Sequence, residues 1–235
     1  MTTYQVRLLL GTEHACSYLP PRAARSVFID PRWKLDPQRY GALLDLGFRR
    51  SGGHVYRPAC SACLECRPVR IPVARFAASR TQRKCERANA DLSLEIGRQL
   101  SDEHFHLYRL YLRTRHPGGG MDPDDRSAFH GFLECAWGDA EVWSLRTPAG
   151  LLVAGAIVDR VPQGLSAVYT FFDPEESARS LGTYAVLRQV QHAREAKLAH
   201  VYLGYWVAGS PKMDYKRRFH PLEELTPQGW RDIRD

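Results

Sequence analysis

Apolar side chains recur at helical spacing in several segments of the chain. The clearest is 101–116, where aromatic and leucine residues form one apolar side behind Ser101, a residue that favours a helix N-terminus. Asp36 and Pro37 open a second such segment in the same way. The spacing predicts helices at 37–48, 79–90, 101–116, 124–137 and 180–197.

Short apolar runs rich in β-branched and aromatic residues predict strands at 141–146, 151–159, 165–172 and 200–204. Gly52 and Gly53 predict a hairpin, and 67–73 is expected to be an edge strand because it contains Pro68 and Pro72. Strands followed by a helix and a further strand indicate a mixed α/β fold with a covered sheet. We expect a boundary near residue 100, dividing the chain into 1–100 and 101–235.

Charge divides the 235-residue chain in the same place. Residues 1–100 carry 17 basic and 8 acidic side chains, whereas 101–235 carry 16 and 18, so the net charge of +7 is the sum of +9 in the first part and −2 in the second. A basic part beside a nearly neutral one indicates an anionic partner, and a solvated basic face is the alternative.

Composition argues against a disordered chain and against a membrane-spanning protein. With 44% hydrophobic and 25% charged residues, the chain has enough apolar surface to fold. The longest apolar run, 151–158, is much shorter than the roughly 20 residues that cross a bilayer. The N-terminus lacks a signal-peptide pattern, so we expect a cytoplasmic protein without membrane contact.

Four of the six cysteines suggest a metal site. Cys60, Cys63 and Cys66 are each separated by two residues, a spacing that lets successive thiolates bind one metal. Zinc or an iron–sulfur cluster would need a fourth ligand, for which Cys16 is the candidate. Reduced thiols that pack a tight turn are the alternative, because stable disulfides are rare in the cytosol.

Basic residues in two segments are candidates for contacts with phosphate. On a helix that starts at Ser79, the side chains of Arg80, Arg83, Lys84 and Arg87 share one face. The segment 201–219 combines aromatic with basic residues, a pairing that suits an unpaired nucleotide, although a core strand followed by a loop explains part of it.

Short motifs in order along the whole chain resemble the bacterial aspartate/glutamate leucyltransferases, relatives of the eukaryotic arginyl-tRNA–protein transferases. The matching segments are Cys16-Ser-Tyr-Leu-Pro, Gly47-Phe-Arg-Arg-Ser-Gly, Tyr56-Arg-Pro-Ala-Cys-Ser-Ala-Cys, Pro68-Val-Arg-Ile, Ser79-Arg-Thr-Gln-Arg, Tyr169-Thr-Phe-Phe-Asp-Pro, Ser180-Leu-Gly-Thr, Tyr202-Leu-Gly-Tyr-Trp and Lys212-Met-Asp-Tyr-Lys. The resemblance implies an N-acyltransferase-like (GNAT-like) C-terminal domain and a smaller N-terminal domain that contains the cysteines.

The resemblance also implies a reaction: an amino acid moves from aminoacyl-tRNA to the N-terminus of a protein, which marks that protein for N-degron degradation through a protease adaptor. The donor ester is already activated, so the chemistry requires no cofactor. The reaction centre implied by the resemblance comprises Tyr169, Asp173, Ser180, Tyr205 and Lys216.

Two sets of cations would hold the substrates. For an acceptor that begins with Asp or Glu, bidentate guanidinium groups are the best partners, and the candidates are Arg57, Arg70 and Arg80. The candidates for tRNA phosphates are Arg83, Lys84, Arg87, Arg217 and Arg218.

Three functions stay open at this point. Leucyl transfer from Leu-tRNA is preferred, because the bacterial type of motif is present throughout. Arginyl transfer from Arg-tRNA to the same acceptors is the second, and a non-catalytic RNA-binding module that holds a metal is the third.

Overall fold

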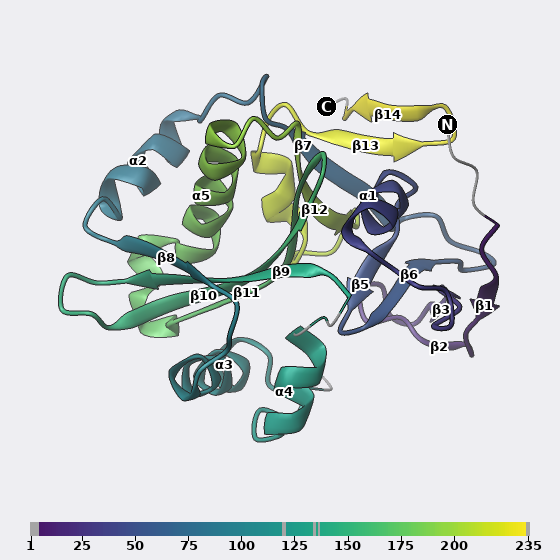
Figure 1. The fold of residues 1–235 in the computed structure, drawn as a ribbon, viewed down its shortest axis with the longest axis horizontal. Helices are drawn as coiled ribbons and strands as arrows, with labels where there is room; N and C mark the ends of the chain where they lie inside the picture. Colours follow the sequence, from purple (N-terminus) through teal and green to yellow (C-terminus); the bar gives the residue numbers. More distant parts are fainter. Residues whose placement is uncertain (1–4, 119–120, 134, 136, 234–235) are drawn as a thin grey trace.

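An eight-stranded mixed sheet forms the centre of the molecule (Figure 1). The computed structural model describes residues 5–118, 121–133, 135 and 137–233. The strand order is β14-β13-β7-β12-β11-β10-β9-β8, in which β11 and β12 are parallel and the other neighbours are antiparallel. The strands are β7 (Arg67–Pro72), β8 (Ser93–Gly97), β9 (Asp139–Arg146), β10 (Leu152–Val161), β11 (Gly164–Phe172), β12 (His200–Trp206), β13 (Glu223–Thr226) and β14 (Gly229–Asp232).

Helices cover both faces of this sheet. Figure 1 shows α2 (Arg80–Ala88) and α5 (Leu181–Glu195) on one face, and α3 (Asp102–Arg115) and α4 (Arg126–Leu133) on the other. Two 3₁₀ helices, η1 (Pro174–Arg179) and η2 (Asp214–Arg218), follow β11 and β12. No helix in the described part of the chain is long and apolar enough to cross a membrane. The expected mixed α/β fold with a large covered sheet is confirmed.

A smaller sheet of order β1-β4-β6-β5 packs beside the large one, together with α1 (Pro37–Asp45) (Figure 1). Its strands are β1 (Leu8–Leu10), β4 (Ser26–Ile29), β5 (Arg49–Ser51) and β6 (His54–Pro58), and the short pair β2 (His14–Ala15) and β3 (Ala23–Ala24) lies nearby. Strand β5 is an edge of this sheet, and its Arg49 and Arg50 side chains contact strands of the large sheet.

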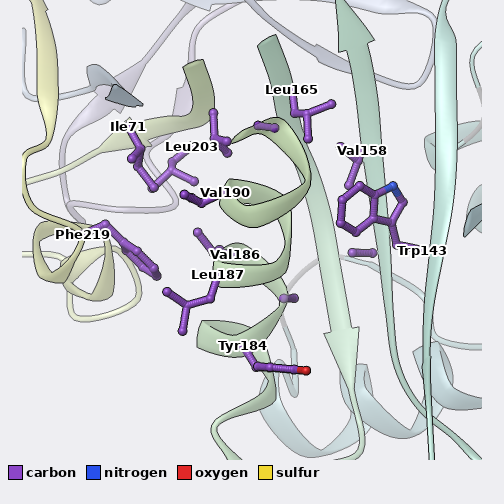
Figure 2. Close-up of a cluster of buried hydrophobic side chains, with 14 of the residues drawn as sticks. Ile71, Trp143, Val158, Leu165, Tyr184, Val186, Leu187, Val190, Leu203 and Phe219 are labelled. Atoms are coloured by element: carbon purple, nitrogen blue, oxygen red, sulfur yellow. The ribbon is translucent and has the colours of Figure 1, made fainter. Parts of the chain in front are cut away.

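The main core lies between α5 and the large sheet. Figure 2 shows Val186, Leu187 and Val190 of α5 among Leu165 and Leu203 of the sheet, all of them buried. Burying a side chain of this size stabilises the fold by about 1.5–3 kcal/mol. The layer therefore holds β11, α5 and β12 in fixed relative positions, and these three elements frame the site described below.

The helices predicted from hydrophobic spacing are present, with ends that differ by a few residues. Asp36 caps α1 by accepting a hydrogen bond from the Arg39 amide at 2.8 Å. Ser79 and Gln82 form a capping box at the start of α2. Local signals were sufficient here, because a helix terminus is decided by residues within one turn of it.

The expectation of an edge strand at 67–73 is wrong. Strand β7 pairs with β12 on one side and with β13 on the other. The ladder with β13 covers only Val69 and Arg70, so Pro68 and Pro72 lie beyond it and remove no hydrogen bond from that side. Because β13 pairs with only two residues of β7, strand β7 can lie in the interior of the sheet and still contain two prolines.

The division near residue 100 stays a prediction. Strands β7 and β8 precede that position in the chain, and both belong to the large sheet with the strands that follow it. The small sheet, by contrast, is built entirely from residues before 60.

Candidate functional site

The two parallel strands at the centre of the large sheet separate soon after they begin. Strands β11 and β12 pair only from Gly164 opposite His200 to Ser166 opposite Tyr202. Beyond that point β11 continues to Phe172 and β12 to Trp206 without pairing to each other. The backbone carbonyls of β11 that face the opening therefore need other partners.

Arg49 of β5 supplies these partners. Its Nη2 donates hydrogen bonds to the carbonyls of Ala167 at 2.7 Å and Val168 at 3.4 Å. On the opposite strand Gly204 has φ +76°, and a Cβ at this position would lie 1.2 Å from Nη1 of Arg49. Only glycine leaves room for the guanidinium between the two strands.

Lys216 of η2 is a second basic side chain in the same opening. It is 4% exposed, and its Nζ donates a hydrogen bond to the Tyr205 carbonyl at 2.5 Å. Burial lowers the pKa of Lys216 well below its ordinary value, and the charge of Arg49 lowers that pKa further. The amine is therefore neutral over a wider pH range than an exposed lysine.

The two predicted catalytic tyrosines, Tyr169 and Tyr205, lie on the separating strands β11 and β12. The Tyr205 hydroxyl donates to the Gly47 carbonyl at 2.8 Å and so connects β12 to the segment that precedes β5. Tyr169 of β11 packs beside Tyr108 and Tyr111 of α3. Burial raises the pKa of both Tyr169 and Tyr205, so their hydroxyls stay protonated at neutral pH.

Asp173 and Ser180 occupy the turn between β11 and α5. The Asp173 carboxylate accepts a hydrogen bond from the Glu175 amide at 2.9 Å and caps η1. Ser180 is exposed and adopts φ +53° directly before α5. Within the described residues no hydrogen bond links either of them to Tyr205 or Lys216, whereas Lys216 donates to the Tyr205 carbonyl.

The three arginines predicted to hold an acidic N-terminus lie on separate elements. Arg70 of β7 is paired with Glu223 at 2.7 Å and with Asp45 at 2.9 Å. Arg57 is exposed on β6 with its guanidinium over the Phe48 ring, and Arg80 is exposed at the start of α2. The structure does not bring these three together.

The predicted tRNA contacts lie on two neighbouring elements, α2 and η2. Arg83, Lys84 and Arg87 are exposed on α2. The Gln82 amide of α2 donates to the carbonyl of Arg218 at 2.9 Å, which places η2 and its two arginines beside the start of α2. Arg217 lies over the Trp206 ring at the end of β12.

The four candidate metal ligands gather at one place beside this site. Burial first, and then the neighbouring thiols of Cys60, Cys16 and Cys63, raise the pKa of Cys66 to about 12. Nitrogen donors already contact three of the sulfurs: the Leu19 amide at Cys16, the Arg25 amide at Cys60 and the Arg22 guanidinium at Cys63. Among the residues with described positions, no three acidic, histidine or cysteine side chains are arranged as metal ligands.

Comparison with known families gives matches over most of the chain. A family model described as arginine-tRNA-protein transferase, C terminus, matches residues 103–226, and the corresponding N-terminus model matches residues 14–84. Residues 169–218, which contain the strand opening and η2, fall within the first of these matches.

Three similar proteins are all named aspartate/glutamate leucyltransferase. The protein from Stenotrophomonas maltophilia strain K279a is 47% identical and covers 97% of this chain and 94% of its own length. Those from Nitrosococcus oceani and Saccharophagus degradans are 44% and 42% identical, covering 100% and 96% of both chains respectively. Among solved structures, FemX has a TM-score of 0.49 at 12% identity, over 88% of this chain and 81% of its own.

Proposed function

The chain belongs to the arginine-tRNA-protein transferase family, and we propose that it transfers leucine from Leu-tRNA to proteins that begin with Asp or Glu. It is an aminoacyltransferase whose substrates are an aminoacyl-tRNA and a protein. The observation that supports leucine over arginine is the 42–47% identity, over nearly the full length of the chain, to proteins named aspartate/glutamate leucyltransferase.

The opening between β11 and β12 is our candidate for the reaction centre. The acceptor amine attacks the ester carbonyl, the new C–N bond forms, and the C–O bond to the tRNA ribose breaks as that oxygen takes up a proton. Because the ester is already activated, the protein's contribution is to position the two substrates and handle one proton.

Lys216 is our candidate for the group that removes the proton from the acceptor amine. An α-ammonium has a pKa of roughly 8, and a neutral lysine amine can accept its proton. The lowered pKa of Lys216 supports this role. The Tyr205 hydroxyl already donates to Gly47, so its proposed part is to hold the strand opening in shape.

The cysteine cluster is our candidate for a structural metal site. Four thiols are the number and type of ligand that zinc or an iron–sulfur cluster takes, and a bound cation would deprotonate them outright. Because the sulfurs are not arranged as metal ligands in the described structure, binding would require them to turn away from their present nitrogen donors. Such a group would fasten the loops around Cys16 and Cys60–Cys66, and no step of the transfer requires it. Metal analysis of anaerobically purified protein tests this: absence of both iron and zinc, with folding unchanged in chelator, would contradict it.

Action in the cytoplasm, and delivery of the leucylated protein to a protease through an adaptor, belong to the same proposal. They follow from the chemistry of marking an N-terminus and from the resemblance set out above.

The test is a transfer assay with labelled Leu-tRNA and Arg-tRNA and with peptides that begin with Asp, Glu, Arg or Lys. We expect leucine to be added to the Asp and Glu peptides only. Arginine transfer to those peptides would replace the donor assignment, and absence of transfer from both donors would favour the RNA-binding module.

A further inference from the structure

Arg49 has partners unlike those of most other buried or half-buried arginines. Arg50 and Arg70 are paired with carboxylates at 2.6–2.9 Å, whereas Arg49 donates only to two backbone carbonyls. No ion pair with a carboxylate joins Arg49 in the part of the chain that the structure describes. A half-buried guanidinium without a counter-charge is costly, because its own charge is only partly solvated.

The surroundings of Arg49 are also poor in negative charge. Its charge acts to lower the pKa values of Tyr18, Tyr40, Tyr205, Tyr215 and Lys216, although burial outweighs this effect for the four tyrosines and raises their pKa values. The tyrosines are protonated at neutral pH and the Lys216 amine is neutral over a widened pH range, so none of these groups supplies a negative charge. Among these described groups, a carboxylate entering this place would meet no competing acid.

A small hollow lies next to the guanidinium. It has a volume of about 10 Å³, close to the space that one water molecule occupies. The residues lining it include Phe48, Arg49, Pro68, Ser166, Tyr202 and Gly204. The hollow is too small for a carboxylate, so an acid side chain would reach the guanidinium only if the lining side chains moved apart. Their mostly apolar surfaces would then exclude water and strengthen the attraction between the guanidinium and the acid group.

We propose that Arg49 binds the side-chain carboxylate of the acceptor's first residue and thereby selects Asp and Glu. This deepens the proposed function and rests on it. The position at the strand opening, beside Lys216, would bring the acceptor's amine close to the candidate base. Arg49 lies within the Gly47–Gly52 motif of the sequence analysis. The sequence alone did not reveal which of the two adjacent arginines in that motif has no carboxylate partner in the described structure.

The test measures equilibrium binding of labelled peptides that begin with Asp or with its neutral isostere Asn, in the absence of tRNA. For the unaltered protein we expect the Asp peptide to bind tighter by on the order of 100-fold. Arg49→Gln is expected to reduce that ratio to within about threefold, and Arg49→Lys to an intermediate value, since it keeps the charge but loses the two-pronged geometry.

Arg98→Gln is the matched control, because Arg98 is exposed and paired with Asp139 far from the opening. It should leave the Asp-to-Asn ratio unchanged. If Arg49→Gln does not fold, Arg49→Lys carries the test, since an unchanged ratio in that folded variant overturns the proposal.

Two outcomes overturn the inference without touching the proposed function. One is an Asp-to-Asn ratio that survives in folded Arg49→Gln. The other is a loss of Leu-tRNA affinity of tenfold or more with the ratio retained, which would assign Arg49 to a phosphate. Failure of the proposed function has a different signature, namely no transfer by the unaltered protein although the peptides bind.

Discussion

Arg49 and Arg50 are adjacent on β5 and lie in opposite electrostatic environments. Arg50 is buried, and its Nε and Nη2 donate to the two carboxylate oxygens of Asp159 on β10 at 2.7 and 2.6 Å. Arg49 points to the other side, into the opening between β11 and β12, where its hydrogen-bond acceptors among the described residues are the carbonyls of Ala167 and Val168. One arginine fastens the two sheets together, and its neighbour is left with capacity to bind an anion.

The difference shows how a β-strand separates two tasks. Successive side chains of a strand point to opposite faces, so one edge strand can place one charge in a closed contact and the next in an open one. A buried pair that is fully hydrogen-bonded keeps its geometry, whereas a cation without a counter-charge remains available to a ligand.

Removing the counter-charge of Arg50 is the strongest way to break this comparison. Asp159→Asn leaves the buried guanidinium without its carboxylate and should lower the free energy of unfolding by about 3–5 kcal/mol. Urea denaturation measures this. The folded fraction should still prefer the Asp peptide over the Asn peptide. A loss below about 1 kcal/mol would mean that Arg50 does not depend on Asp159.

Adding a methyl group at Gly204 tests the environment of Arg49 in the opening between β11 and β12 without changing any charge. Gly204→Ala puts a Cβ into the space of the Arg49 side chain and imposes φ +76° on an alanine. We expect a loss of about 1–3 kcal/mol in the free energy of unfolding. Displacement of the guanidinium should weaken Asp-peptide binding more than Asn-peptide binding, and equal weakening would count against it.

Arg49→Gln should be milder for stability than Asp159→Asn. It removes two hydrogen bonds from a charged donor but also relieves a poorly compensated charge, so we expect a loss of about 1–2 kcal/mol. Denaturation in urea, run beside Asp159→Asn, gives the direct comparison. If both variants lose equal stability, the distinction between a fastening and a binding arginine fails.

His104 illustrates a third way to bury a titratable group, as a neutral ring. Its Nε2 contacts the Ser144 hydroxyl at 2.9 Å and its Nδ1 the Ser101 hydroxyl at 2.7 Å. Burial, and then the charge of Arg146, lowers the pKa of His104 below 6.5. The unfolded chain therefore binds a proton first as pH falls.

The contribution of His104 to the free energy of unfolding should accordingly be fully present above pH 6.5. It should decrease as the pH falls below that value, by up to about 1.4 kcal/mol per pH unit. His104→Asn should reduce this slope between pH 6.5 and 5.5 in urea titrations. His116 and His200 also have lowered pKa values, so part of the slope should persist. An unchanged slope would exclude His104 as a contributor.

Much of this architecture could be predicted from local sequence. The Asp36 and Ser79 caps, the Gly52–Gly53 turn and the alternation in 165–172 depend on neighbours within a few residues, and the elements formed as expected. The order of motifs predicted the family, because many short matches in sequence are improbable by chance. The predicted catalytic residues stay a prediction, and their proximity could not be read from the sequence: Lys216 donates to the Tyr205 carbonyl, but Asp173 and Ser180 lie in a separate turn.

The sequence by itself determined the elements, the basic character of the first hundred residues and the reaction class. Only the tertiary structure decided which cations are already paired with acids. Arg70 is paired through β13 and α1, and Arg50 through β10, by residues 25 to 153 positions away in the chain. Counter-charges act through space and fall off with distance, so linear spacing does not reveal that Arg49 alone of these three is left without one.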